Sequence, residues 1–266
     1  MLPTETSDVT NGNMNARNPT LLTLACLALA GCFPEHAERT VAGTRVVTLQ
    51  HDYTNTHAIV GDDGRIVLVD SGLERNVPAL EKALTASGLD PSRIVAVVLT
   101  HGHADHAGGA KAFQQQGAVV IAGAADEPLL RDGQNDPLCP TNADARGRLA
   151  ADQAERYQGL TADVQVTSTT SLLERTGLDA EVVAIPGHTP GSLVVRVGQS
   201  VFVGDLLRGS VFGSDAEVHF YMCDVEANRR DVQALLARWP DVSTWFVGHF
   251  GPLTRAAVQA KFGAKP

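Results

Sequence analysis

The sequence predicts a mixed α/β fold, built as one large domain in which strands and helices alternate. Short apolar runs that suit buried strands, most clearly residues 94–99, alternate with segments whose apolar residues recur at helical spacing, such as residues 225–239. The chain has 266 residues, of which 44% are hydrophobic, and this is enough to build a sizeable core. These observations disfavour a disordered chain, a helical bundle and an all-β sandwich.

The predicted elements follow these runs in order, and turn residues such as Gly61-Asp62-Asp63-Gly64 separate several of them. Strands are predicted at residues 45–49, 57–61, 65–69, 94–100, 118–122, 164–168, 181–185, 193–197, 201–203 and 244–247. Helices are predicted at residues 77–86, 109–116, 143–157, 225–237 and 253–262. Residues 131–142 and 208–223 show no regular period and are predicted to be long loops at the rim of a site.

The N-terminal segment differs in kind from the rest of the chain. Residues 20–30 form an apolar run that is too short to span a bilayer, and it leads into Leu29-Ala30-Gly31-Cys32, which resembles the lipobox of bacterial lipoproteins. A secretory signal is therefore predicted over residues 1–31, with Met14 as an alternative start. A buried N-terminal helix is the competing interpretation.

Lipidation is predicted at Cys32, followed by a short tether over residues 32–43 and a folded domain over residues 44–266. The protein is then expected to be exported to the periplasm and anchored by lipid to the bacterial membrane, with the outer membrane favoured. In that oxidising compartment, Cys139 and Cys223 either form a disulfide or remain two separate buried thiols.

The charge and hydropathy of the chain restrict its partners. The formal net charge is -9, which opposes binding to nucleic acids, because that binding depends on lysine and arginine side chains. No run of about 18 or more apolar residues occurs, so no membrane-spanning helix is expected. A small molecule is the expected partner, and the sequence specifies no oligomeric state.

One short segment concentrates lone-pair-bearing side chains at the end of the predicted strand 94–100. His101, His103, Asp105 and His106 lie within six positions. In an extended segment, residues two apart point the same way, so His101 and His103 are expected to face one point. Asp105 and His106, beyond a bend, are expected to face a neighbouring point. Imidazole nitrogen and carboxylate oxygen are usual zinc ligands, so the two faces predict a site for two metals.

The segment His101-Gly102-His103-Ala104-Asp105-His106 resembles the HxHxDH signature of the metallo-beta-lactamase superfamily, and four further motifs occur in the order of that family. They are Asp70-Ser71-Gly72, Pro186-Gly187-His188-Thr189-Pro190-Gly191-Ser192, Val203-Gly204-Asp205, and Val247-Gly248-His249 with Gly251-Pro252. The resemblance runs from about Val46 to the C-terminus. It implies a four-layer αββα sandwich with the metals at one edge, between the two sheets.

The resemblance also implies which residues bind each metal. The implied ligands are His101, His103 and His188 for the first metal, Asp105, His106 and His249 for the second, and Asp205 bridging both. By the same resemblance, Asp70 steadies the loop that carries the ligands. Two Zn2+ ions are the expected cofactors, with iron or manganese as alternatives.

Two divalent cations about 3.5–4 Å apart can hold a hydroxide at neutral pH, because each lowers the pKa of the shared water. A metal-dependent hydrolase is therefore predicted, in which this hydroxide attacks the carbonyl of a small ester, thioester or lactone. Asp105 is predicted to be the catalytic residue that orients the hydroxide and takes part in proton transfer. Ser71 and Ser192 show no partnered base in the sequence, so no serine nucleophile is expected.

The residue at position 205 bears on the substrate. Family members that hydrolyse β-lactams generally have cysteine or serine there, so Asp205 favours the glyoxalase II-like, lactonase-like and esterase branches. Glyoxalase II has a further helical region after its last ligand, whereas seventeen residues follow His249 here, which disfavours glutathione thioesters. The family's topology also places Cys139 and Cys223 over the pocket, which implies a disulfide at its mouth.

Three further residues are candidates for substrate binding. Arg208 is predicted to hold a substrate carboxylate by a bidentate pair, with a surface salt bridge as the alternative. His219 and Tyr221 are predicted to donate to the oxyanion, with packing at the rim as the alternative. A β-lactamase, a non-haem iron redox protein of the same fold, and a binding protein with a relic site are the competing functions.

Overall fold

A computed structural model describes residues 36–41 and 43–264. The predicted signal segment, the lipidation site at Cys32 and the start of the predicted tether lie outside these residues. Within them, no helix is long and apolar enough to cross a membrane.

Within the described residues, the first sheet has seven strands that lie in chain order. They are β1 (His36–Val41), β2 (Thr44–His51), β3 (Thr54–Val60), β4 (Ile66–Val69), β5 (Ile94–Val98), β6 (Val119–Gly123) and β7 (Val164–Val166). Strands β1 to β4 pair antiparallel, and β4 to β7 pair parallel. The carboxyl ends of β4, β5 and β6 therefore meet at one edge, where open parallel sheets commonly bind ligands.

The second sheet, counted over the same residues, has six strands in the order β15-β14-β11-β10-β9-β8. They are β8 (Thr169–Ser171), β9 (Glu181–Ala184), β10 (Leu193–Val197), β11 (Ser200–Phe202), β14 (Thr244–Phe246) and β15 (Leu253–Thr254). Strands β11 and β14 pair parallel and the other neighbours pair antiparallel. A separate ribbon pairs β12 (Arg208–Gly209) with β13 (Ala216–Glu217), inside the segment predicted to be a loop.

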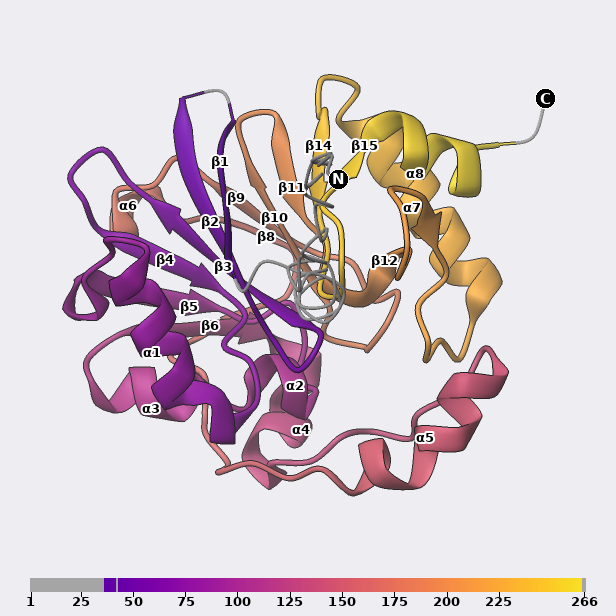
Figure 1. The fold of residues 1–266 in the computed structure, drawn as a ribbon, viewed down its shortest axis with the longest axis horizontal. Coiled ribbons are helices and arrows are strands. Elements are labelled where there is room, and N and C mark those ends of the chain that lie inside the picture. Colours follow the sequence, from indigo (N-terminus) through magenta and orange to yellow (C-terminus); the bar gives the residue numbers. More distant parts are fainter. Residues whose placement is uncertain (1–35, 42, 265–266) are drawn as a thin grey trace, which may run out of the picture. The chain divides into compact units, whose positions relative to one another are not determined.

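Helices cover the outer face of each sheet (Figure 1). Helices α1 (Val77–Ala86) and α3 (Ala110–Gln115) lie beside the first sheet, and α7 (Val225–Arg238) and α8 (Arg255–Phe262) lie beside the second. The shorter or more peripheral helices are α2 (Ala104–Ala107), α4 (Glu127–Asp132), α5 (Ala143–Ala154) and α6 (Leu173–Thr176).

Three apolar cores lie between the four layers. Leu68 and Phe113 belong to the core between the first sheet and its helices, and Trp245 belongs to the core under α7 and α8. The middle core joins the two sheets and includes Val69 and Phe202. Strand β4 is buried on both faces, because its successive side chains alternate between the outer and the middle core. The predicted αββα sandwich is therefore confirmed.

The predicted tether is wrong over residues 36–41, which form strand β1. This strand pairs with β2 from His36↔Leu49 to Val41↔Thr44. Glu38, Arg39 and Thr40 are exposed. An edge strand of this kind lacks the alternation of apolar residues by which a sequence shows a strand.

The helix predicted over residues 253–262 begins later than expected. Leu253 and Thr254 pair with β14, and the helix starts at Arg255. The side chain of Thr254 accepts a hydrogen bond from the backbone N–H of Ala257 at 3.2 Å, so Thr254 is the N-cap. The helix predicted over residues 143–157 similarly ends early, at Ala154.

Candidate metal centre

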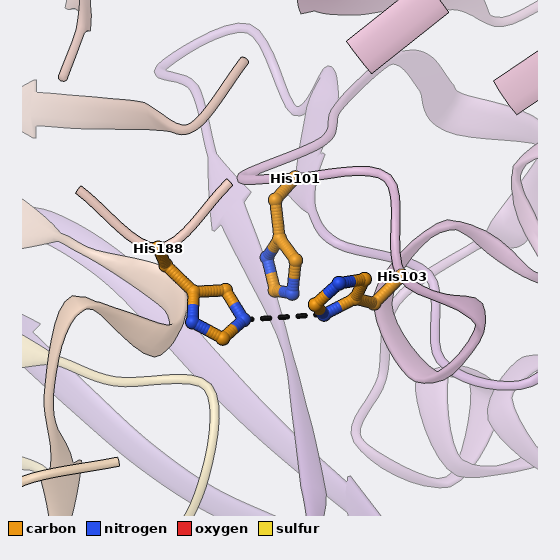
Figure 2. A group of neighbouring side chains, drawn as sticks. All are labelled: His101, His103 and His188. Atoms are coloured by element: carbon orange, nitrogen blue, oxygen red, sulfur yellow. Dashed lines mark hydrogen bonds between the residues drawn. The ribbon is translucent and has the colours of Figure 1, made fainter. Parts of the chain in front are cut away.

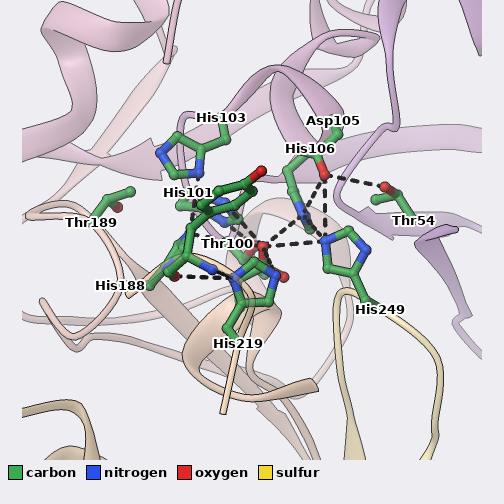
Figure 3. A network of polar contacts seen from close by, with 12 residues as sticks. Thr54, Thr100, His101, His103, Asp105, His106, His188, Thr189, His219 and His249 are labelled. Atoms are coloured by element: carbon green, nitrogen blue, oxygen red, sulfur yellow. Dashed lines mark hydrogen bonds and ion pairs between the residues drawn. The ribbon is translucent and has the colours of Figure 1, made fainter. Parts of the chain in front are cut away.

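Polar side chains follow the strands of both sheets at the points where these strands end. Asp70 follows β4, the segment from His101 to His106 follows β5, Asp126 follows β6, His188 follows β9, Asp205 follows β11 and His249 follows β14. Figure 3 shows that the histidines of this set converge from both sheets on one place. All seven predicted metal ligands are therefore brought together.

The local conformation differs from the expected one. Strand β5 ends at Val98 and α2 begins at Ala104, so His101 and His103 lie in an irregular turn rather than in an extended strand. Their rings still converge, with centroids 4.6 Å apart.

The first group of ligands is formed by His101, His103 and His188, which point toward one another (Figure 2). His188 Nε2 lies 3.1 Å from His103 Nδ1, and the ring centroids of His101 and His188 are 4.6 Å apart. All three side chains are largely buried. Three imidazoles in this arrangement can bind one cation.

The second group is formed by Asp105, His106 and His249. His249 Nε2 lies 3.4 Å from Asp105 Oδ2 and 3.4 Å from His106 Nε2. Asp205 lies between the two groups, because its Oδ2 is 3.7 Å from His101 Nε2 and 3.3 Å from His106 Nε2. This position fits the bridging role that the family resemblance implies.

Each ring has an inner nitrogen, which faces the cluster, and an outer nitrogen, which faces away from it. In four of these rings an oxygen atom lies within hydrogen-bond distance of the outer nitrogen. The pairs are His101 Nδ1 with Thr100 Oγ1 at 3.0 Å, His103 Nε2 with Asp136 Oδ1 at 2.6 Å, His106 Nδ1 with Asp70 Oδ2 at 2.8 Å, and His249 Nδ1 with the Tyr53 carbonyl at 3.0 Å. Carboxylate and carbonyl oxygens only accept hydrogen bonds, and the Thr100 hydroxyl already donates to Asp70. Each outer nitrogen therefore carries a hydrogen.

A neutral imidazole that carries its hydrogen on the outer nitrogen has its lone pair on the inner one. The inner nitrogens face one another and Asp205, and the buried His101 Nε2 has no hydrogen-bond partner among the described residues. Lone pairs at these separations repel unless a proton or a cation lies between them. The donor set therefore fits divalent metal ions, with outer partners that orient each ring.

The electrostatics divide the centre into two halves. Burial and the neighbouring imidazoles lower the pKa of His101 and His188 well below its usual value, so both rings are neutral. Burial also acts to lower the pKa of His249, but Asp205 and Asp105 outweigh it and raise that pKa to about 10. Protons therefore occupy the second group when metal is absent, and metal binding there must release them.

Asp205 is a buried, ionised carboxylate in the middle of the cluster. Burial opposes its ionisation, but His106, His219 and His249 outweigh burial and hold the pKa of Asp205 well below its usual range. Its side chain is only 2% exposed. A buried carboxylate is costly unless it is paired, so this charge requires the surrounding cationic or metal-binding groups.

Asp126 was not predicted, although it holds both loops of the first group. Its carboxylate accepts hydrogen bonds from Gly102 N at 2.9 Å, Gly191 N at 2.7 Å and Thr189 Oγ1 at 2.7 Å. The approach is so close that a Cβ on Gly191 would lie 2.5 Å from Asp126 N. The signal that could have found Asp126 is its place just after β6, the parallel neighbour of β5.

Asp136 was also missed, because it lies in the irregular segment between α4 and α5, 33 positions from His103. Replacing Asp136 with alanine is expected to lower zinc affinity about 10–100-fold, the usual effect of losing an outer partner of a ligating histidine. Competition with a chromogenic chelator measures this affinity, and Asp179→Ala, at an exposed site outside the cluster, is the matched control. Equal affinities in the two variants would mean that Asp136 does not orient His103.

Two of the three predicted substrate-binding residues have polar or aromatic partners of their own. The Arg208 guanidinium stacks 4.1 Å from the centroid of the Phe220 ring and donates to the Gly209 carbonyl at 2.8 Å, so the carboxylate clamp stays a prediction. Tyr221 lines the cavity beside the cluster, and its hydroxyl donates to Asp152 Oδ2 at 2.5 Å and lies 3.1 Å from the Ala145 carbonyl oxygen. These contacts fit the alternative of packing at the rim, and the donation by Tyr221 to an oxyanion stays a prediction.

The third predicted substrate-binding residue, His219, lies inside the cluster, with its Nε2 3.1 Å from Asp205 Oδ2.

Cys139 and Cys223 form a disulfide, as the resemblance implied. The disulfide joins the segment that carries Asp136 to the segment that carries His219, so one covalent link fixes both beside the centre.

The fold and the cluster together define a class of protein. Its members are four-layer αββα sandwiches that carry a histidine- and aspartate-rich cluster, able to hold metal ions, at the edge between the two sheets. The family follows from the sequence comparison. The chain belongs to the metallo-beta-lactamase superfamily, whose family model matches residues 50–241.

Curated relatives include a hydroxyacylglutathione hydrolase of Xanthomonas axonopodis pv. citri (strain 306), 33% identical over 151 residues, which are 56% of this chain and 45% of the relative. The probable metallo-hydrolase YybB of Bacillus subtilis (strain 168) is 28% identical over 170 residues, which are 63% of this chain and 68% of the relative. The chain thus spans less than half the length of the first relative.

Solved structures with the same fold include the metallo-beta-lactamase family protein TTHA1429 from Thermus thermophilus, with a TM-score of 0.61 and 22% identity over 84% of this chain and 79% of that chain. DIM-1 metallo-beta-lactamase has a TM-score of 0.57 and 20% identity over 86% of this chain and 97% of that chain. At these identities the likeness bears on the fold alone.

Proposed function

We propose that the protein is a metal-dependent hydrolase with a dinuclear centre that cleaves small esters, thioesters or lactones. The observation that carries the proposal is the set of seven side chains, Asp205 among them, that lie in neighbouring groups able to hold metal ions while outer partners hold the rings. When bound, divalent ions would polarise a carbonyl oxygen and lower the pKa of a water molecule, which is the chemistry that such hydrolysis needs.

The residues of the chain would position the reactants. The Asp105 carboxylate would accept a hydrogen bond from the attacking water, because Asp105 lines the cavity beside the cluster and Thr54 Oγ1 donates to its Oδ2 at 3.2 Å. Burial opposes the ionisation of Asp105, but His106 and His249 outweigh it and hold its pKa below the usual range. An ionised Asp105 can orient the water without first losing a proton of its own.

A cavity of about 440 Å3 opens beside the cluster and reaches Asp105, Asp205 and His249. Its apolar wall includes Leu73, Leu138, Val211, Phe220 and Phe250, which suits an acyl group.

The charged rim of this cavity disfavours anionic substrates. Both arginines among the described lining residues pair with carboxylates: Arg75 lies 3.1 Å from Glu155 and 3.4 Å from Asp52, and Arg148 lies 3.7 Å from Asp152. Carboxylates outnumber guanidinium groups on this rim. A neutral acyl substrate is therefore favoured over a glutathione thioester or a β-lactam, both of which bring carboxylates of their own.

The proposal is tested by metal analysis and by a matched pair of substrates. About two zinc ions per chain are expected, with hydrolysis of 4-nitrophenyl butyrate at least about tenfold faster in kcat/KM than hydrolysis of the anionic 4-nitrophenyl hemisuccinate, a difference of about 1.4 kcal/mol. Glu155→Gln removes one of the two carboxylates that pair with Arg75, so this variant is expected to have a smaller ratio of butyrate to hemisuccinate hydrolysis. Glu174→Gln, at an exposed remote site, is expected to leave the ratio unchanged.

The outcomes separate the hypotheses. No turnover of esters, thioesters or lactones by the zinc-loaded protein would refute the proposed function, and a preference for the hemisuccinate would refute the argument from the rim. Efficient hydrolysis of nitrocefin would favour a β-lactamase, and iron in place of zinc would favour a redox protein.

We also propose that the protein is exported and anchored by lipid at Cys32. The disulfide between Cys139 and Cys223 supports this proposal, because disulfides persist in oxidising compartments. Mass spectrometry of the membrane fraction would detect the acylated Cys32.

A further inference from the structure

His219 brings a sixth imidazole into the cluster, outside the set of ligands that the family resemblance implies. Its ring lies between those of His188 and His249, with centroid separations of 5.0 and 5.1 Å, and is 3% exposed (Figure 3). It belongs to the segment between β13 and α7, which supplies none of the seven implied ligands.

The inner nitrogen of His219 points at the centre. His219 Nε2 lies 3.1 Å from Asp205 Oδ2, closer than the nitrogens of His106 or His249, which both lie 3.3 Å from that oxygen. Despite this short distance, Nε2 is buried and lacks the geometry of a hydrogen bond to any described group. An atom in this position is explained if it binds a cation rather than donating a proton to Asp205.

The outer nitrogen indicates which tautomer is present. His219 Nδ1 can donate a hydrogen bond to the Tyr221 carbonyl oxygen at 3.1 Å or accept one from the Tyr221 backbone N–H at 3.3 Å. The two contacts require opposite tautomers, and the shorter one, to an acceptor, favours the hydrogen on Nδ1. The lone pair is then on Nε2, which is the form that binds a metal.

The backbone around His219 holds the ring in this place. Thr141 Oγ1 donates to the His219 carbonyl at 2.7 Å, and Thr141 N donates to the Phe220 carbonyl at 2.8 Å. The disulfide between Cys139 and Cys223 closes the same pair of segments. A histidine fixed before any ion arrives loses little conformational freedom on binding.

We propose that His219 is a metal ligand, acting together with His188 and Asp205. These three residues already form a group whose donor atoms lie within 4.8 Å of one another. The proposal rests on the metal binding in the proposed function but adds a ligand to it, and it replaces the oxyanion role predicted for His219 from the sequence.

Two substitutions separate a ligand from a hydrogen-bond donor. His219→Ala removes both functions, whereas the side-chain amide of His219→Gln still donates a hydrogen bond to Asp205 but is a poor zinc ligand. Both variants are expected to lose zinc affinity by at least about tenfold in chelator competition. X-ray absorption of the zinc-loaded variants is expected to count fewer imidazoles than in the wild type. His51→Gln, at a histidine outside the cluster, is the matched control.

Wild-type affinity in His219→Gln, or in both variants, would overturn the proposal. If the variants fail to fold, 15N-histidine NMR of the wild type decides instead, because zinc must shift the His219 Nε2 resonance if this atom is a ligand. A wild type that binds two zinc ions with that resonance unmoved contradicts the role of His219 alone. A wild type that binds no zinc overturns the proposed function together with it.

Discussion

Replacing Asp205 with asparagine is expected to strip metal from both halves of the centre and to lower kcat/KM by more than about 1000-fold. Asp205 Oδ2 lies 3.1–3.8 Å from the Nε2 atoms of five histidines, so the carboxylate belongs to both groups at once. Loss of an outer partner alone costs about 10–100-fold in metal affinity, and loss of the bridging charge must cost more. Metal content per chain and ester hydrolysis, measured on the same sample, check this result.

The choice of asparagine keeps the shape of the side chain, so packing is preserved and the charge is the variable. Asp62→Asn, in an exposed turn, is the control and is expected to keep wild-type metal content and activity. Two zinc ions retained at wild-type affinity in Asp205→Asn would mean that Asp205 is not the bridge.

The metal ligands could be predicted from the sequence because each sits in a short motif just after an apolar strand. A strand of this kind ends at the edge of its sheet, so His101 after β5 and His249 after β14 reach the same edge. The layers could be predicted for a related reason, since buried runs alternate with helical ones. Strand β1 could not be predicted from the sequence, because its exposed side chains resemble those of a tether.

The residues that hold the ligands in place could not be predicted in the same way. Asp136 contacts His103 across 33 positions, and Asp126 contacts Gly191 across 65. A single aspartate in a loop has no local pattern, and only the folded chain gives it a partner. For Arg208, the place near Asp205 in the sequence suggested a substrate contact, and only the folded chain shows that its guanidinium stacks on Phe220.

Asp126→Ala is expected to lower the free energy of unfolding by about 3 kcal/mol or more, because three buried donors lose their acceptor at about 1–3 kcal/mol each. Asp126 is fully buried, and those donors are Gly102 N, Thr189 Oγ1 and Gly191 N. Chemical denaturation of the metal-free protein measures the loss. Asp132→Ala, which removes an exposed carboxylate six positions away, is expected to change stability by less than about 0.5 kcal/mol.

The metal content of Asp126→Ala distinguishes a local role from general destabilisation. Gly102 lies between His101 and His103, and Thr189 and Gly191 follow His188, so Asp126 holds the loops of the first group. The second group depends instead on Asp70, which accepts from His106 Nδ1 at 2.8 Å. The variant is therefore expected to keep about one zinc per chain, and parallel loss of both ions would show that Asp126 supports the whole fold rather than this half of the centre.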